Sequence, residues 1–558
     1  MADQNTKRGR IESRKSHLSD QRENWMTHWR KLSQYILPRR GQFLATKRHP
    51  NRGGIMNDQI VDSTATLAAR TLSSGLLAGL TSPSRPWFRL TVPDPDLAES
   101  KDVRLWLEVV ERRMYEVFAR SNFYKALPQV YLELGVFGTG ALLCEDDYEN
   151  VVHFRPFTVG SYMLANSSKL RTDSFYREMQ MTSAQMVEMF GVDKCSSAVR
   201  SEYERGDSDH WHDVVQAIQP NTKPMQGTYK ASDKPFVSCW YEVGSDEVDF
   251  LRESGFDEFP VMAPKWMVTA EDPYGSSCPG MEAYGDIKAL QLEQRRKAEA
   301  IDKMVKPPLI GPKALENEYP SLLPGDITYL NVMQGAQKLE PIYTVNPPLR
   351  DLKEDIAENQ NRIRRAFHED LFLMLAMSDR RDMTAREVQE RHEEKLLMLG
   401  PVLEGLIDDL LDPVIDRTFS LMLRDPRTMI PEAPKTIQGQ GLKVEYISVL
   451  AQAQRAVGIS AVERLWGFAG GLAQMNPEVL DKLDFDQTID EYAAMAGVSP
   501  SLVLDDVAVR QKRQQRAKQQ QQEQQMMQQR EMIEQAKLVS ETQPATEEEI
   551  SDMVGSPV

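Results

Sequence analysis

This chain contains little cysteine, and that shortage excludes two kinds of small stabilised domain. Its 558 residues include only Cys144, Cys195, Cys239 and Cys278, with no C-x-x-C pair among them. A disulfide framework or a zinc knuckle would need paired spacings that the sequence lacks. We therefore expect all four thiols to be reduced and buried.

Long apolar runs are also missing. The longest, residues 371–377, is far short of the roughly 18 residues that a membrane-spanning helix needs. The polar, basic N-terminus lacks the apolar segment of a signal peptide. We expect a soluble, intracellularly made protein of several globular domains, with no membrane partner.

Positive charge is scarce outside the first 52 residues. The net charge is −16, yet residues 1–52 hold thirteen Lys and Arg against four Asp and Glu, which leaves −25 for the remainder (54 basic, 79 acidic). An acidic body with one basic arm argues against a protein that clamps nucleic acid tightly over most of its surface. It does not exclude a protein that lets DNA pass.

Catalytic patterns are absent as well. The sequence contains no Ser-His-Asp, H-E-x-x-H or Walker pattern, so it predicts no enzyme, no cofactor and no metal site. One cluster could ligate a metal, but we favour a solvated loop between strands because no matching ligand pair occurs elsewhere. The alternative is a metal-dependent hydrolase or nuclease, which an activity lost on mutating His210 and His212 would support. The cluster comprises Asp207, Asp209, His210, His212 and Asp213.

What the chain does contain is a pair of long helices around a compact insert. Residues 285–306 carry a thin apolar line and end before two prolines, and residues 349–377 are predicted as a second, continuous helix. Its segment 351–376 would run about 39 Å at 1.5 Å per residue. Because two half-amphipathic helices leave apolar faces wet, we expect packing between subunits. The residues assigned to that packing are Leu352, Ile356, Ile363, Phe367 and Leu371.

Turn residues dominate the insert between these helices. Residues 307–348 combine Gly-Pro and Pro-Gly pairs with short apolar runs, which predicts a small β-containing tip. Glu316, Glu318 and Tyr319 lie where the tip has little core of its own, so we expect a partner-docking surface. Ordinary exposed loop residues are the alternative.

The remaining segments have local signals of their own. Residues 64–80 predict a helix, the Gly-x-Gly at 138–140 predicts a turn between a helix and a strand, and residues 141–268 predict a mixed α/β domain that contains a helix at 183–190. Thr384 caps a further helix, with kinks expected at Gly400-Pro401 and at Pro413.

The C-terminal part is predicted to be helical. Leu465, Trp466, Phe468 and Leu472 are its expected core residues. Residues 502–537 contain neither Gly nor Pro, which favours a helix, although their Gln-rich runs leave a prion-like disordered tail as the alternative.

Five segments in order resemble the head-to-tail connector (portal) proteins of short-tailed bacteriophages. The resemblance spans roughly residues 25–507, and several ordered segments are far more specific than a lone motif. The basic arm and the Gln-rich tail match no motif. The segments are residues 79–90 (GLTSPSRPWFRL), 274–280 (YGSSCPG) running into 286–290 (DIKAL), 384–388 (TAREV), 399–403 (LGPVL) and 448–455 (SVLAQAQR).

The resemblance implies an α+β, multidomain portal fold assembled as a ring. It has long stem helices, a small β-containing clip, a mixed α/β wing and a C-terminal helical crown and barrel. The implied divisions are the N-terminal arm and wing (1–284), stem helix 1 (285–306), clip (307–348), stem helix 2 (349–377), channel loop (378–384), kinked wing and crown helix (385–444), crown (445–505), Gln-rich helical barrel (506–540) and acidic tail (541–558).

The resemblance also implies a function. Twelve subunits would form the channel at one capsid vertex for DNA packaging, retention and ejection, in a virion component made in the host cytoplasm. A separate ATP-driven motor would thread the double-stranded DNA. The implied partners are the large terminase subunit and then tail adaptor or nozzle proteins, the major capsid protein and scaffold, and internal core or ejection proteins. A monomeric coiled-coil adaptor without a channel is the remaining alternative, and a native mass measurement separates it from a ring.

One polar loop is the expected contact with DNA. It follows the helix that should line the channel, and its two arginines sit between acids, so any grip on phosphate should be weak and salt-sensitive. The alternative is that the arginines pair with the flanking acids or with a neighbouring subunit. The loop residues are Ser378, Asp379, Arg380, Arg381 and Asp382.

Overall fold

The computed structural model divides the chain into two compact units, residues 1–454 and residues 455–558, which are described separately. The structure describes residues 6–44, 58–94, 97–98, 100–222, 224, 230, 233–245, 247–306, 309–310, 340–341, 348–377, 399–439, 441–447, 462, 465–472, 482–495 and 506–542.

Helices form one layer of the first unit. The helix predicted at residues 64–80 is confirmed as α2, and it packs against α5 through buried Ala and Leu side chains. The turn predicted after α5 is also confirmed. Gly138 has a φ of 80°, and a Cβ there would lie 2.6 Å from the carbonyl oxygen of Gly275, so only glycine fits. The helices are α1 (Lys7–Tyr35), η1 (Pro38–Phe43), α2 (Thr64–Leu80), α4 (Lys101–Arg120) and α5 (Phe123–Phe137).

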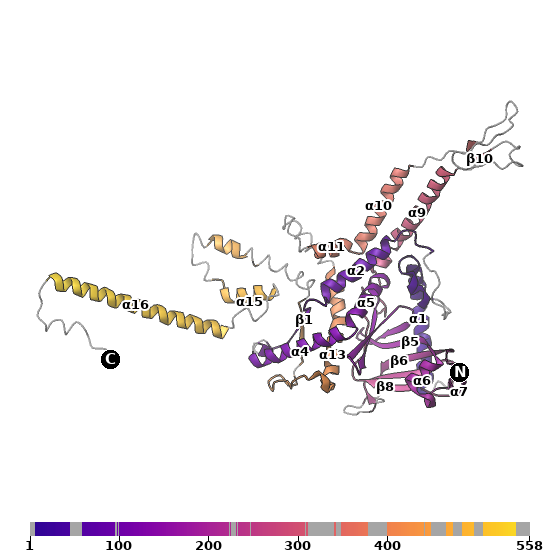
Figure 1. Ribbon diagram of the computed structural model, residues 1–558, viewed down its shortest axis with the longest axis horizontal. Coiled ribbons are helices and arrows are strands. Elements are labelled where there is room, and N and C mark those ends of the chain that lie inside the picture. Colours follow the sequence, from indigo (N-terminus) through magenta and orange to yellow (C-terminus); the bar gives the residue numbers. More distant parts are fainter. Residues whose placement is uncertain are drawn as a thin grey trace. The chain divides into compact units, whose positions relative to one another are not determined.

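Antiparallel strands form two sheets in the same part of the chain, and we call the helices above and these sheets together the wing. The larger sheet has five strands in the order β4-β5-β6-β7-β8, and a three-stranded sheet has the order β3-β2-β9 (Figure 1). The helix predicted at residues 183–190 is confirmed as α6 (Ser183–Phe190), which with η2 (Val192–Lys194) and α7 (Ser197–Glu204) follows β5. The strands are β2 (Ala141–Asp147), β3 (Val151–Phe157), β4 (Tyr162–Asn166), β5 (Thr172–Thr182), β6 (Trp211–Pro220), β7 (Phe236–Glu242), β8 (Arg252–Phe256) and β9 (Val261–Met262).

The basic N-terminal segment is largely one helix bound to this wing. Arg8 of α1 donates to the carbonyl oxygens of Val248 (2.7 Å) and Glu242 (3.0 Å). Arg22 donates to the carbonyl oxygens of Gly160 and Tyr162, and both arginines are buried. Burial of these guanidinium groups is tolerated because backbone oxygens accept their protons. These two positive charges of the segment therefore bind backbone oxygens within the subunit.

A helical pair extends from the wing and carries the insert. Figure 1 shows α9 and α10 side by side, with β10 beyond the far end of α9. The described part of the insert is a two-stranded antiparallel ladder of β10 and β11. The elements are α8 (Pro279–Glu282), α9 (Tyr284–Val305), β10 (Leu309–Ile310), β11 (Glu340–Pro341), α10 (Leu349–Ala366) and α11 (Glu369–Met377).

The prediction of one continuous helix over residues 349–377 is wrong. The helix breaks at Phe367 and His368, where His368 has a φ of 53°. After the break, α11 packs against α2, and its consecutive residues Leu371 and Phe372 are both buried. The ring of Phe372 lies against Gly75 of α2, where a Cβ would come within 2.2 Å of it. Packing on α2 therefore outweighs local helical propensity.

Residues 399–424 are helical, with an irregularity next to the proline where a kink was expected. Ile407–Leu411 form a π-helical segment, in which the amide of Asp412 donates to the carbonyl of Ile407. Pro413 has no amide hydrogen for the preceding turn, which favours such a rearrangement. The chain continues through α13 (Asp412–Arg424) and η6 (Pro426–Thr428) to β12 (Lys443–Tyr446), which pairs with β1 (Phe88–Thr91).

The second unit is helical in its described residues. α15 (Phe485–Met495) carries Phe485, whose ring lies 4.8 Å from that of Trp466, and α16 (Asp506–Thr542) contributes an ion pair between Arg513 and Asp486 at 2.6 Å. The helical prediction for the Gln-rich segment is confirmed. Expecting Leu465, Phe468 and Leu472 to be core is wrong, since they are 52%, 67% and 37% exposed, whereas Trp466 is partly buried. Helical spacing identifies an apolar face but not what covers it.

Candidate functional site

The apolar line of α10 is covered within the same chain. Ile356, Ile363, Phe367 and Leu371 are all buried, with Ile363 and Phe367 at 0% exposure, while Leu352 is partly buried. α10 packs against both α9 and α2, and α11 against α2. The expectation that a neighbouring subunit covers these residues is therefore wrong for the single chain, because α2 packs on them although it lies more than 260 residues earlier in the sequence.

Asp62 fastens both helices to the start of α2. Its Oδ2 accepts hydrogen bonds from Gln294 of α9 (2.9 Å) and Gln360 of α10 (2.8 Å). Its Oδ1 accepts from the amide (2.8 Å) and hydroxyl (2.5 Å) of Thr64, the first residue of α2. Burial opposes ionisation, but the hydrogen bonds from Thr64, Gln360 and Gln294 together lower the pKa of Asp62 below its ordinary value. One carboxylate thus connects three helices.

A further side-chain amide, that of Gln291, completes this connection. We call Asp62, Gln291, Gln294 and Gln360 together the Asp62 clamp. Gln291 of α9 is buried, accepts from the amides of Val61 (2.7 Å) and Asp62 (2.8 Å) and donates to the carbonyl of Asp62 (2.8 Å). At the adjacent residues, Asn359 of α10 donates to both carboxylate oxygens of Glu293 of α9 at 2.9 Å. These hydrogen bonds fix the helices to each other and to the wing.

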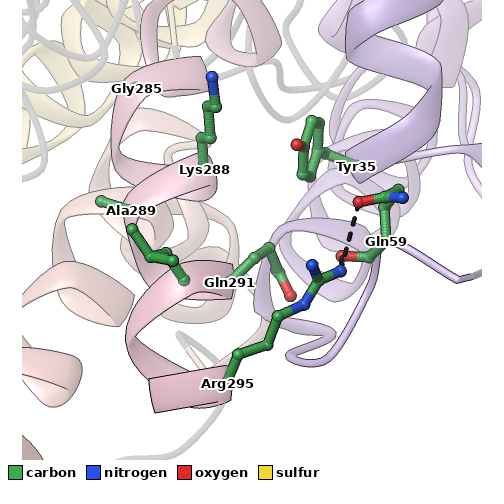
Figure 2. A pocket seen from close by; sticks show the side chains of 8 residues that line it. Tyr35, Gln59, Gly285, Lys288, Ala289, Gln291 and Arg295 are labelled. Atoms are coloured by element: carbon green, nitrogen blue, oxygen red, sulfur yellow. Dashed lines mark hydrogen bonds between the residues drawn. The ribbon is translucent and has the colours of Figure 1, made fainter.

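A hollow of about 320 Å³ lies beside the clamp, between α9 and the facing residues Tyr35 and Gln59. Figure 2 shows Arg295 reaching across to Gln59, with Tyr35 on the facing side and Gly285 and Ala289 leaving space along the helix. Arg295 donates to Gln59 Oε1 (3.3 Å) and to the carbonyl of Asp58 (3.2 Å). The Tyr35 ring is edge-on to Tyr284 at 6.0 Å. The walls of the hollow are thus held by contacts of their own.

The Asp and His cluster does not gather as a single ligand set. His212 lies in β6, and its Nε2 is 2.8 Å from Glu202, while Nε2 of His210 is 3.2 Å from Asp207. Ser183 donates to Glu202 (2.6 Å), so these side chains satisfy each other at the end of the sheet. Within the described ranges, no group of three or more His, Cys, Asp or Glu could hold a metal ion. The glutamate partners Glu202 and Glu242 were not identified from the sequence.

All four cysteines are free and buried, as predicted. Burial raises the pKa of the Cys144 and Cys278 thiols to about 12 and that of Cys239 to about 11. At neutral pH they are protonated and behave as small apolar groups.

Two of the expected sites lie outside the described residues. They are the docking residues Glu316, Glu318 and Tyr319 and the channel-loop residues Ser378, Asp379, Arg380, Arg381 and Asp382. No described helix is long and apolar enough to cross a membrane.

The family model described as "Bacteriophage head to tail connecting protein" matches residues 8–504. That range includes both sheets, the helical pair and the Asp62 clamp. The chain therefore belongs to this family of phage head-to-tail connectors, the portal proteins.

Two relatives match over nearly their whole length. The "Portal protein" of Salmonella phage epsilon15 is 47% identical over 512 residues, which cover 92% of this chain and 91% of that protein. The "Probable portal protein" of Bordetella phage BPP-1 is 44% identical over 517 residues, 93% and 92% of the two chains. A chain of the structure titled "Virion of native gene transfer agent (GTA) particle" is only distantly similar, with a TM-score of 0.33 at 11% identity over 77% of this chain and 94% of that one.

These matches confirm the resemblance found in the five segments. The protein has an α+β fold, as expected, and is a phage portal, with a structural role in a ring at the junction of head and tail. It is a virion component at the capsid vertex. The comparisons give no support to the metal-dependent hydrolase.

Proposed function

We propose that twelve copies of this chain close into a ring whose channel passes double-stranded DNA into the head during packaging and out of it during ejection. The observation that carries the proposal is the α9–α10 pair, which extends from the wing and is fastened to it by the Asp62 clamp. We assign this pair as the stem, residues 307–348 as the clip and residues 506–540 as a helical barrel. The protein is made in the host cytoplasm.

Charge supports a channel that lets DNA slide. Twelve chains carry roughly −190 charges (twelve times −16). Net negative charge repels phosphate, which suits a moving duplex because tight contacts would stall it. Arg380 and Arg381, which we assign to the channel loop, supply the weak positive contact that centres and retains the DNA. A separate ATP-driven motor supplies the hydrolysis.

The clip is the proposed docking surface for two partners, which bind it one after the other. Glu316, Glu318 and Tyr319 first engage the large terminase subunit and later the tail adaptor or nozzle proteins. Alanine at all three positions should leave rings intact and weaken both interactions, while unchanged binding would move the docking surface elsewhere. The major capsid protein and scaffold surround the wing, and internal core or ejection proteins meet the end inside the head.

Two measurements test the proposed channel. Native mass spectrometry should give about 760 kDa, twelve times 63.6 kDa, and a monomer under all conditions would refute the ring. Arg380→Ala with Arg381→Ala should assemble normally and reduce packaged or retained DNA. The matched control is Arg112→Ala with Arg113→Ala, another adjacent pair, on wing helix α4. Full packaging by the loop variant would remove the loop from the DNA path.

A further inference from the structure

The first helix, α1, lies across the five-stranded sheet, and a seven-residue repeat fits it to that sheet. Arg8, Lys15 and Arg22 recur at this spacing and contact β7, β5 and β4, respectively. Ile11 and Leu18 recur at the same spacing and are buried among apolar side chains of the sheet. Seven helical residues advance about 10.5 Å, close to two strand spacings of about 4.8 Å. Each repeat therefore brings one cation and one apolar side chain to a further part of the sheet.

The N-terminal half of this contact is mostly charged. Lys7 pairs with Glu253 of β8 at 2.7 Å, and Lys15 pairs with Glu178 of β5 at 2.7 Å. Both pairs are partly exposed, so dissolved ions can reach and screen them. Residues 7–18, which we call the strap, contain only the two apolar side chains of the seven-residue repeat. The strap therefore depends on its ion pairs more than on apolar burial.

The following part of α1 is held in a different way. Trp29 and Leu32 are both 0% exposed and belong to the main core cluster. The indole of Trp29 donates to the carbonyl of Phe137 at 3.1 Å and lies edge-on to Tyr274 at 5.1 Å. Apolar burial contains no pair of opposite charges for dissolved ions to screen. We call residues 26–36 the anchor, and we expect its contacts to be insensitive to salt.

The strap covers an apolar patch that contains a cysteine. Cys239 of β7 is 1% exposed and belongs to the same buried cluster as the two apolar side chains of the strap. Burial raises the pKa of Cys239 to about 11, and the charge of Lys7 opposes part of that rise. Cys144 and Cys278 are buried in the main core cluster instead. The chain thus carries one thiol beneath the strap and two reference thiols away from it.

We propose that the strap is a salt-sensitive device: at high ionic strength residues 7–18 detach from the sheet while the anchor stays docked, which uncovers the apolar patch around Cys239. The two ion pairs are the contacts that dissolved ions weaken, and helix ends open at a lower free energy than a packed core. The hydrogen bonds from Arg8 to the carbonyls of Glu242 and Val248 still favour the docked state when the salt concentration falls. The basic N-terminal segment thereby acts on its own subunit, and the inference does not depend on the ring.

Alkylation of the cysteines by N-ethylmaleimide, measured by peptide mass spectrometry on the full chain, tests the release. Raising NaCl from about 0.05 M to about 0.5 M should speed the labelling of Cys239 about fivefold. Labelling of Cys144 and Cys278 should stay slow, which also shows that the core remains folded. The same change in salt should raise deuterium uptake in the strap and not in the anchor. Equal labelling of Cys239 at both salt concentrations, or equal acceleration of all three thiols, would overturn the proposal.

Neutral substitutions show whether the two ion pairs are the salt-sensitive contacts. Lys7→Gln with Lys15→Gln should label Cys239 at low salt about as fast as the wild type does at high salt, and should lose most of the salt response. Loss of the Lys7 charge by itself leaves more of the thiol protonated and slows labelling, so faster labelling reports strap opening. Lys31→Gln with Lys125→Gln, at exposed lysines of the anchor and of α5, is the matched control and should behave as wild type. A strap variant as slow as wild type at low salt would refute the proposal.

Discussion

The two units of this chain treat their apolar side chains differently. In residues 1–454, large aromatic residues such as Trp29, Phe118 and Phe123 are completely buried in one cluster. In the described part of residues 455–558, Phe468, Ile489 and Met527 are 67%, 58% and 70% exposed. The first unit closes a core within one chain, whereas the described part of the second leaves these three side chains largely exposed. In a ring-forming protein, we expect other chains to cover them.

The largest expected effect on stability comes from comparing the same type of substitution, isoleucine to aspartate, in each of the two units. Ile363→Asp places a charge in the covered seam between α10 and its neighbours and should cost about 4 kcal/mol or more of unfolding free energy. Ile489→Asp on α15 is the matched change at an exposed isoleucine and should stay within about 0.5 kcal/mol. Urea unfolding of the isolated subunit measures both. Equal effects would remove the distinction between the two units.

An intermediate effect is expected at the Asp62 clamp. Asn in place of Asp62 retains one acceptor but turns an amide toward the donating amides of Gln294 and Gln360. Asp62→Asn should cost about 1–2 kcal/mol at pH 7, since the site is partly exposed and water screens it. Asp209→Asn, at an exposed loop carboxylate, is the control.

The difference in stability between wild type and Asp62→Asn should depend on pH in one direction. Because the folded-state pKa of Asp62 is lowered, its stabilisation is present above the unfolded-state pKa of about 4 and is lost as pH falls through the folded value. The gap in stability between wild type and Asp62→Asn should therefore close in acid. A gap of constant size down to pH 2 would contradict an ionised clamp.

The smallest effect on the isolated subunit is expected on α16. Met526→Gln with Met527→Gln changes two exposed side chains and should alter subunit stability by less than about 0.5 kcal/mol. Ring stability, followed by mass under increasing urea, should fall if other chains cover this helix. Rings as stable as wild type would show that these methionines stay exposed after assembly.

Local signals in the sequence were reliable where short-range physics decides the structure. The helix at 64–80, the helix at 183–190 and the Gly138 turn needed only composition, spacing and backbone geometry. The break at His368 was not predictable in that way, because no Gly or Pro marks it and the cause is contact with α2. The Asp62 clamp joins residues 232 and 298 positions apart, and nothing local distinguishes its glutamines from surface ones.

The clamp also bears on how the particle responds to its ionic surroundings. It is built from amides and a single carboxylate, so no pair of opposite charges is there for counterions to shield. Packed DNA brings a dense atmosphere of cations. These cations screen the attraction between exposed charges, with a screening length below about 10 Å. The joint between wing and helical pair should keep its strength in that atmosphere, while contacts made through exposed charges soften. A portal built this way should keep its helical pair fixed to the wing when the head is full.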